Sequence, residues 1–142
     1  MLQIRIAKLH KDAILPWQAT TMAAGWDLFT CTDGSMILHP SKTVVVGTGI
    51  AIELPPNCFG YITGRSGLAK RGIHVHPGTI DPDYRGEIKL ILTNLSERAF
   101  LIEHGQRLAQ LLVLPRAYVS WKLVPQLTET LRGSNGLGST GI

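Results

Sequence analysis

Short segments in which apolar and polar residues alternate follow one another along most of the chain. An apolar residue at every second position is typical of a β-strand that buries one face. The segments with this character are residues 2–9, 35–38, 43–54, 58–63, 73–76, 87–94, 99–102 and 108–114. The 8 prolines lie at or beside the boundaries of these segments, where no strand N–H has to be donated. The pattern predicts an all-β fold: a sandwich, a jelly roll or a distorted barrel.

Two segments depart from this pattern. Residues 66–71 have helical character, and Gly72 is expected to end the helix after about one and a half turns. From Arg132 onward the chain is glycine-rich without periodic apolar residues, so it cannot order itself by burial. We therefore expect an all-β domain over residues 1–125 and a flexible glycine-rich arm over residues 126–142.

Composition narrows the classes of function. A chain of 142 residues is most simply one domain. Its net charge of +4 is dispersed, which fits a binder of small anions better than a nucleic-acid tail. Cys31 and Cys58 form no CxxC pair, which argues against a zinc site or a disulfide framework and for a reducing compartment. Neither a signal-peptide core nor an apolar run of membrane-spanning length is present, so we expect a soluble protein without a membrane partner.

The segment from residue 78 to residue 87 stands out for its chemistry. It reads Gly-Thr-Ile-Asp-Pro-Asp-Tyr-Arg-Gly-Glu between two strand-like segments, which predicts Asp81 to Tyr84 at the tip of a β-hairpin. Asp and Pro favour turns by themselves, so a solvated loop without a task is the alternative. Tyr84 argues against that alternative, because a large aromatic ring is unexpected at such a tip.

Several glycine-containing segments carry groups that bind phosphate. Arg65 and Ser66 lie at the start of the predicted helix, where a guanidinium, a hydroxyl and free backbone N–H groups favour an anion. Arg132 and residues 138–141 offer a second guanidinium, two hydroxyls and flexible amides. Each segment alone is common in loops; together they indicate a site for a polyphosphate.

The order and spacing of five segments resemble the five motifs of the trimeric dUTPases. These segments are residues 24–28, 64–69, 78–87, 105–111 and 132–141. The resemblance implies a distorted jelly roll of the β-clip type and the hydrolysis of dUTP to dUMP and pyrophosphate, assisted by Mg²⁺. It also implies a homotrimer with shared active sites, in which the arm closes the site of a neighbouring subunit. We expect such an enzyme in the cytoplasm or nucleus, and the sequence is compatible with a viral as well as a cellular origin.

For the nucleoside half of the substrate, the resemblance assigns roles to four residues. Asp81 resembles the general base that activates the attacking water. Tyr84 resembles the ring that packs against the deoxyribose and excludes a ribose 2′-hydroxyl. Gly78 and Ile80 belong to the hairpin whose main-chain groups pair with uracil, which needs no particular side chain.

For the phosphates, the resemblance names residues from the other segments. Arg65, Ser66, Gly67 and Gln110 match positions that hold the phosphate chain. Asp27 resembles the carboxylate that supports Mg²⁺ indirectly through water, while triphosphate oxygens and water bind the metal itself. The positions that match the closing arm are Arg132, Leu137, Gly138, Ser139 and Thr140.

The arm departs from the family pattern at two positions. Asn135 stands where a glycine is usual, and Leu137 stands where a phenylalanine stacks on uracil. These departures motivate an alternative: a nucleotide-binding or regulatory protein of the same fold with weakened catalysis. A third hypothesis, the related dCTP deaminases, fits the residues from 78 to 84 and the glycine-rich arm less well.

Restoring the aromatic residue of the arm should raise activity. An aromatic stack contributes about 0.5–1.5 kcal/mol beyond area burial. By rate arithmetic, the upper end corresponds to about tenfold. We therefore expect Leu137→Phe to raise kcat/KM for dUTP by up to about tenfold in steady-state kinetics. Leu131→Phe, the same change outside the motif, is the control, and equal kinetics for both variants would contradict this interpretation.

Overall fold

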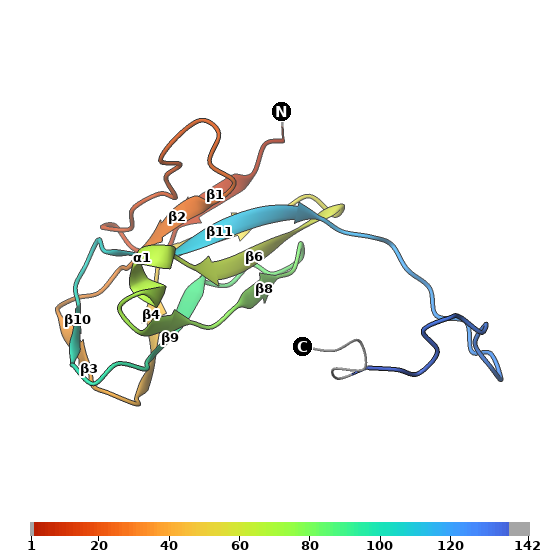
Figure 1. The fold of residues 1–142 in the computed structure, drawn as a ribbon. Helices are drawn as coiled ribbons and strands as arrows, with labels where there is room; N and C mark the ends of the chain where they lie inside the picture. The colour runs from red at the N-terminus through yellow and green to blue at the C-terminus, as the bar shows by residue number, and fades with distance from the viewer. Residues whose placement is uncertain (1, 137–142) are drawn as a thin grey trace.

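The computed structural model describes residues 2–136, and nearly all of its regular structure is β-strand (Figure 1). The elements, in chain order, are β1 (Arg5–Lys8), β2 (Trp26–Phe29), β3 (Met36–Leu38), β4 (Thr43–Gly47), β5 (Ile50–Glu53), β6 (Cys58–Gly64), α1 (Ser66–Ala69), β7 (Ile73–Val75), β8 (Gly78–Ile80), β9 (Lys89–Asn94), β10 (Phe100–Ile102) and β11 (Arg107–Pro115). The all-β prediction with one short helix is confirmed.

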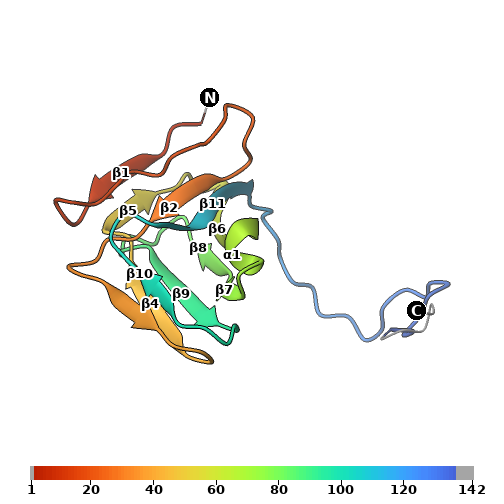
Figure 2. The same cartoon turned by 60° about the vertical axis from the view of Figure 1, so that its left-hand side comes forward.

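The strands form two larger antiparallel sheets and two small ones. One sheet has the order β2-β11-β6-β8 and the other the order β4-β9-β7, while β1 pairs with β5 and β3 with β10. In the two views of Figures 1 and 2 the β11 and β6 ribbons lie in one layer and the β4 and β9 ribbons in another. The arrangement is the expected jelly-roll type of sandwich.

The core between the layers follows from the alternation of the strands. In β9, Leu90 and Leu92 are fully buried, whereas Lys89 and Ile91 on the opposite face are exposed. Leu90 and Leu92 belong to one hydrophobic cluster with Leu28 of β2 and other apolar residues of both large sheets. A register shift of one residue would turn this apolar set toward solvent, so the core fixes the register.

Two predicted elements are interrupted or shortened by backbone geometry. The segment 43–54, predicted as one strand, is two strands, because the chain turns at Thr48 and Gly49, where φ of Gly49 is +66°. The helix is shorter than predicted, since it ends at Ala69. Gly72 follows with φ +77°, a left-handed conformation that favours glycine, as expected for a helix stop.

The two strands that flank Asp81 to Tyr84 pair with each other as predicted, but the connection between them is more than a simple hairpin turn. β7 does pair with β9, but β8 intervenes and pairs with β6 of the other sheet. The turn itself is present, since the N–H of Tyr84 donates to the carbonyl of Asp81 at 3.1 Å. Asp81 and Tyr84 therefore lie where the chain crosses from one layer to the other.

After Pro115 the chain leaves the sandwich (Figure 1). Residues 116–136 form no strand or helix and are exposed, including the large apolar side chains of Trp121 and Leu123. The boundary at residue 125 stays a prediction, and Leu137, Gly138, Ser139 and Thr140 lie outside the described residues. Within residues 2–136, no helix is long and apolar enough to cross a membrane.

One buried polar side chain should dominate the stability of the β9–β10 corner. The amide of Asn94, fully buried, donates to the carbonyls of Leu38 and Arg98 and accepts from the N–H and the hydroxyl of Ser96. We expect Asn94→Ala to lower the free energy of unfolding by about 2–3 kcal/mol, because buried partners lose their hydrogen bonds. Chemical denaturation measures this. Asn57→Ala, at an exposed position, is the control, and equal losses would contradict the assignment.

Candidate functional site

Three segments converge on the carboxylate of Asp27. β11 lies between β2 and β6 in the sheet, so the start of β2, the end of β6 and the first half of β11 are neighbours. Asp27 Oδ1 lies 3.0 Å from Arg65 Nε, and Asp27 Oδ2 accepts from Arg107 Nη1 at 3.2 Å. The Asp27 side chain is only 12% exposed, whereas those of Arg65 and Arg107 are 33% and 41% exposed. The carboxylate is therefore nearly covered, and the two guanidinium groups are partly open to solvent.

The two arginines are also held by contacts other than the ion pairs. Arg65 Nη1 donates to the carbonyl of Arg107 at 2.9 Å. The Arg107 guanidinium lies over the ring of Trp17, 5.3 Å from its centroid. Because their positions are fixed before any ligand arrives, the two cations form a preorganised place for an anion.

Arg107 joins Asp27 and Arg65 in the structure, although the sequence prediction assigned it no role. It lies inside the segment 105–111, from which only Gln110 was assigned a role. The sequence signal that pointed to Arg107 was a positive charge three residues before Gln110, in the same segment. Its proximity to Arg65 depends on the pairing of β11 with β6, which the sequence alone does not reveal.

The predicted phosphate residues Ser66, Gly67 and Gln110 lie beside this cluster. Ser66 is the first residue of α1, and a side chain at Gly67 would meet open space. The amide of Gln110 donates to the carbonyl of Gly64 at 2.9 Å, at the point where β6 runs into α1. A Cβ at Gly25 would overlap Gln110, so that glycine makes room for the amide. Arg65 and Ser66 border a cavity of about 500 Å³.

The predicted nucleoside residues form a second, separate group. Gly78, Ile80, Asp81 and Tyr84 line a cavity of about 250 Å³. The carboxylate of Asp81 is exposed and makes no protein hydrogen bond among the described residues, so both oxygens can accept from water. Glu87, a residue that the sequence prediction left without a role, lines the same cavity.

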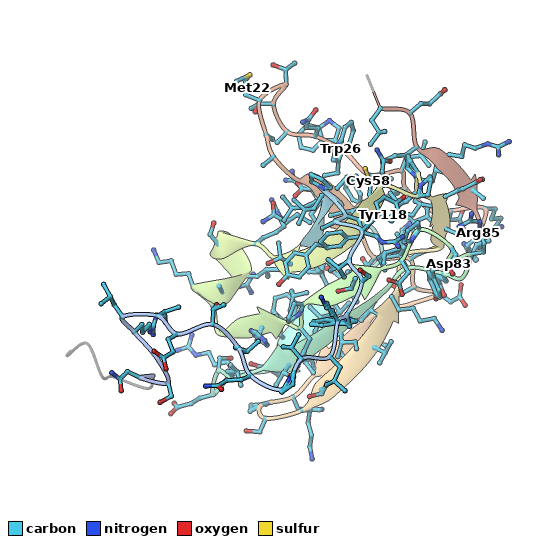
Figure 3. All side chains as sticks on the ribbon, turned by 90° about the vertical axis from the view of Figure 1, so that its right-hand side faces the viewer. Met22, Trp26, Cys58, Asp83, Arg85 and Tyr118 are labelled. Atoms are coloured by element: carbon cyan, nitrogen blue, oxygen red, sulfur yellow. The ribbon has the colours of Figure 1, made fainter. Side chains whose placement is uncertain are left out.

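Asp81 and Arg65 lie toward opposite ends of β6. Ile80, the neighbour of Asp81, pairs with Gly60, and Arg65 follows the far end of the strand. Five strand residues span about 16 Å at roughly 3.3 Å per residue. In Figure 3, Asp83 and Arg85 mark the turn that follows Asp81 at the right of the view, and Trp26 marks the start of β2 nearer its centre. The chain thus brings Arg65, Ser66, Gln110 and Asp27 together, but it does not bring them to Asp81.

Of the predicted arm residues, only Arg132 is among those described. Its Nε donates to the carbonyl of Asn135 at 3.0 Å, and the N–H of Asn135 donates back to the carbonyl of Arg132. Among residues 2–136 neither hydrogen bonds nor ion pairs join Arg132 to either group. The structure therefore places Arg132 in a local turn of the exposed segment.

The donor set around Asp27 bears on the predicted role of Mg²⁺. Both carboxylate oxygens already contact arginines, which leaves Asp27 better suited to bind water than to ligate a metal directly. Within the described part of the chain there is no cluster of three or more His, Cys, Asp or Glu residues. The residues fit a magnesium ion whose ligands are phosphate oxygens and water, with Asp27 acting through that water.

Comparison with known proteins gives a full-length match. The family model described as dUTPase matches residues 11–141. The deoxyuridine 5′-triphosphate nucleotidohydrolase of Hydrogenobaculum sp. is 47% identical, with 99% of each chain covered. The solved structure of the dUTPase of Staphylococcus bacteriophage 80alpha with dUPNHPP has a TM-score of 0.88 at 24% identity over 99% of both chains.

A second solved structure has a similar fold. It is the structure of a mutant dUTPase from phage phi11 of S. aureus, which reveals how a structural Mg(II) ion is coordinated in that protein. Its TM-score is 0.81 at 22% identity. The alignment covers 87% of this chain and 97% of the phage protein.

Proposed function

This chain belongs to the dUTPase family, and on that premise we propose that it is a dUTP diphosphatase that releases dUMP and pyrophosphate. The observation that carries the proposal is the full-length relative at 47% identity, which bears the name of that activity. The structure supports it with two groups of residues that suit the two ends of a nucleotide. One group offers cations and hydroxyls, and the other offers a carboxylate beside an aromatic ring.

Asp81 is the general base in this proposal. Its exposed carboxylate accepts a proton from a water molecule, whose oxygen attacks the α-phosphorus in line with the leaving group. The bond between the α-phosphorus and the bridging oxygen breaks, and pyrophosphate leaves with that oxygen. The absence of a protein hydrogen bond to Asp81 among the described residues leaves its lone pairs available for this water.

Tyr84 is the sugar-selecting residue. Its ring borders the same cavity as Asp81, at a turn whose backbone crosses between the two layers. A ring packed against the deoxyribose leaves no room for a ribose 2′-hydroxyl and no partner to hydrogen-bond it. Gly78 and Ile80 present main-chain groups of β8 to the base.

Arg65, Ser66, Gln110 and Arg107 hold the phosphates. Their cations and donors stabilise the charge that moves onto the departing pyrophosphate. Asp27 orients Arg65 and Arg107 and accepts from water of the metal's hydration shell. Mg²⁺ bound to the triphosphate supplies charge neutralisation and aligns its oxygens.

A complete site needs more than one chain. The separation of about 16 Å along β6 exceeds the reach from the sugar to the α-phosphate, so one substrate cannot use both groups of one chain. Apposing Asp81 of one subunit to Ser66 of another solves this in a homotrimer with closed symmetry. The segment from 126 to 142 then serves as the arm that brings Arg132, Leu137, Gly138, Ser139 and Thr140 to a neighbouring site.

A substrate panel with a base variant tests the activity. We expect pyrophosphate release from dUTP with Mg²⁺, and much less from UTP, dTTP or dCTP. Asp81→Asn should lower kcat by about 10²–10⁴ while leaving dUTP binding intact, because only proton transfer is lost. Asp83→Asn is the matched control and should stay active. If the wild type binds dUTP but turns it over at a rate near background, the regulatory alternative is favoured. If ammonia is released from dCTP, the dCTP deaminase alternative is favoured.

Mixing two inactive variants tests the shared site. Asp81→Asn and Ser66→Ala damage different groups, so each alone should be nearly inactive. Co-expressed one to one, they should regain about a quarter of the wild-type activity, because random assembly places an intact Asp81 beside an intact Ser66 at about one site in four. Co-expression of Asp81→Asn with Asp81→Ala is the control. Mixed trimers that remain as inactive as this control would contradict a site shared between chains.

A further inference from the structure

We propose that Glu87 is a positioning residue that sets the sugar selectivity of the site by holding the ring of Tyr84 in place. The inference rests on the proposed function and extends it to a residue that contacts neither the base nor the phosphates in that proposal. Its basis is a continuous set of contacts from the Tyr84 hydroxyl to the corner between β4 and β5.

The first contact fixes the ring. The Tyr84 hydroxyl donates to the main-chain carbonyl of Glu87 at 2.9 Å, closing a loop of three residues back onto the backbone. Gly86 lies within that loop, and a Cβ there would overlap the Tyr84 hydroxyl. The ring therefore lies directly against the backbone of Gly86, and its position depends on where the backbone of Glu87 is held.

The second contact anchors Glu87 itself. Its Oε1 accepts the N–H of Gly49 at 2.9 Å, and the side chain is 28% exposed. Gly49 lies in the turn between β4 and β5 with φ +66°, and a Cβ at Gly47 would overlap the same carboxylate. The corner between β4 and β5 is thus shaped to receive this carboxylate.

The backbone beyond Glu87 is tied to the same corner. The carbonyl of Ile88 accepts from the N–H and the hydroxyl of Thr48 at 3.2 and 2.7 Å, and its N–H donates to Ile50 at 2.9 Å. The hydrogen bond between the Glu87 carboxylate and the Gly49 N–H is the attachment to this corner that lies nearest to the Glu87 carbonyl, the acceptor of the Tyr84 hydroxyl. Without it, the main chain at Glu87 would be held to this corner, among the described residues, through its neighbour Ile88.

A direct electrostatic effect on Asp81 is the competing role for Glu87. Lys89 Nζ lies 4.0 Å from Glu87 Oε2, and both residues line the cavity with Asp81. The two roles differ in what they need: positioning needs an acceptor for the Gly49 N–H, whereas the electrostatic role needs the negative charge. Glu87→Gln separates them, because the amide oxygen keeps the acceptor and removes the charge.

The observable is the ratio of kcat/KM for dUTP to that for UTP. A ring freed from its position makes room for the 2′-hydroxyl, so Glu87→Ala should lower this ratio by about tenfold, the size expected from losing one charged hydrogen bond. Glu87→Gln should stay within about twofold of the wild type, since its acceptor is kept. Glu97→Ala, at an exposed position in the β9–β10 turn, is the control and should leave the ratio unchanged.

A double-mutant cycle shows whether the effect passes through Tyr84. Tyr84→Phe removes the hydroxyl bond to Glu87 and should lower the ratio in the wild type, but it should change little more in the Glu87→Ala background, because coupled residues are not additive. If Glu87→Ala is unfolded by thermal denaturation, Glu87→Asp, which withdraws the carboxylate from Gly49, takes its place with the same expectation. An unchanged ratio in Glu87→Ala, a Glu87→Gln as impaired as Glu87→Ala, or full additivity with Tyr84→Phe would overturn the proposal.

The proposed function can fail independently of this inference. If the wild type does not hydrolyse dUTP, the proposed activity is wrong, and the ratio of the dissociation constants of UMP and dUMP, measured by calorimetry, replaces the kinetic ratio. A wild-type preference for dUMP that Glu87→Ala loses and Glu87→Gln keeps supports the positioning role. Equal preference in all three proteins contradicts it.

Discussion

The pairing of β6 with β11 on one edge and β8 on the other fixes where the residues around Asp27 and the turn at Asp81 lie. β11 carries Gln110 and Arg107 to the end of β6, where the turn into α1 presents Arg65 and Ser66. β8 carries Asp81 to the opposite end. One strand thus both gathers the proposed phosphate residues and keeps them away from Asp81, and this separation supports the proposal of a site built between chains.

Local pattern predicted the elements with strong alternation but not the pairing between them. The alternation at Leu90 and Leu92 indicates the buried face of β9, and both ends of that strand were predicted to within two residues. β8 was missed, since three residues beginning with glycine show no alternation, and the break at Gly49 was hidden inside an apolar run. The site residues were predicted from their chemistry and from the resemblance to a family, whereas Arg107 owes its place to a partner more than forty residues away.

The cluster of Asp27, Arg65 and Arg107 illustrates how a carboxylate can serve the proposed phosphate site. An isolated negative charge beside the phosphates would repel them, but here it is nearly covered and lies between two guanidinium groups. Burying such a group is costly unless it is paired, and the pairing also restricts the rotamers of both arginines. The net local charge remains positive, and the cations need not reorganise when a polyphosphate arrives.

The close contact between the Tyr84 hydroxyl and Gly86 restricts which substitutions the protein can accept during evolution. Every residue other than glycine has a Cβ, so every amino-acid replacement at Gly86 places an atom where that hydroxyl now lies. Position 86 has no side chain to contact a nucleotide, yet its mutational tolerance is coupled to that of Tyr84. If Tyr84 selects the sugar as proposed, a replacement at Gly86 displaces the ring that excludes ribonucleotides, so sugar selectivity depends on a residue without a side chain.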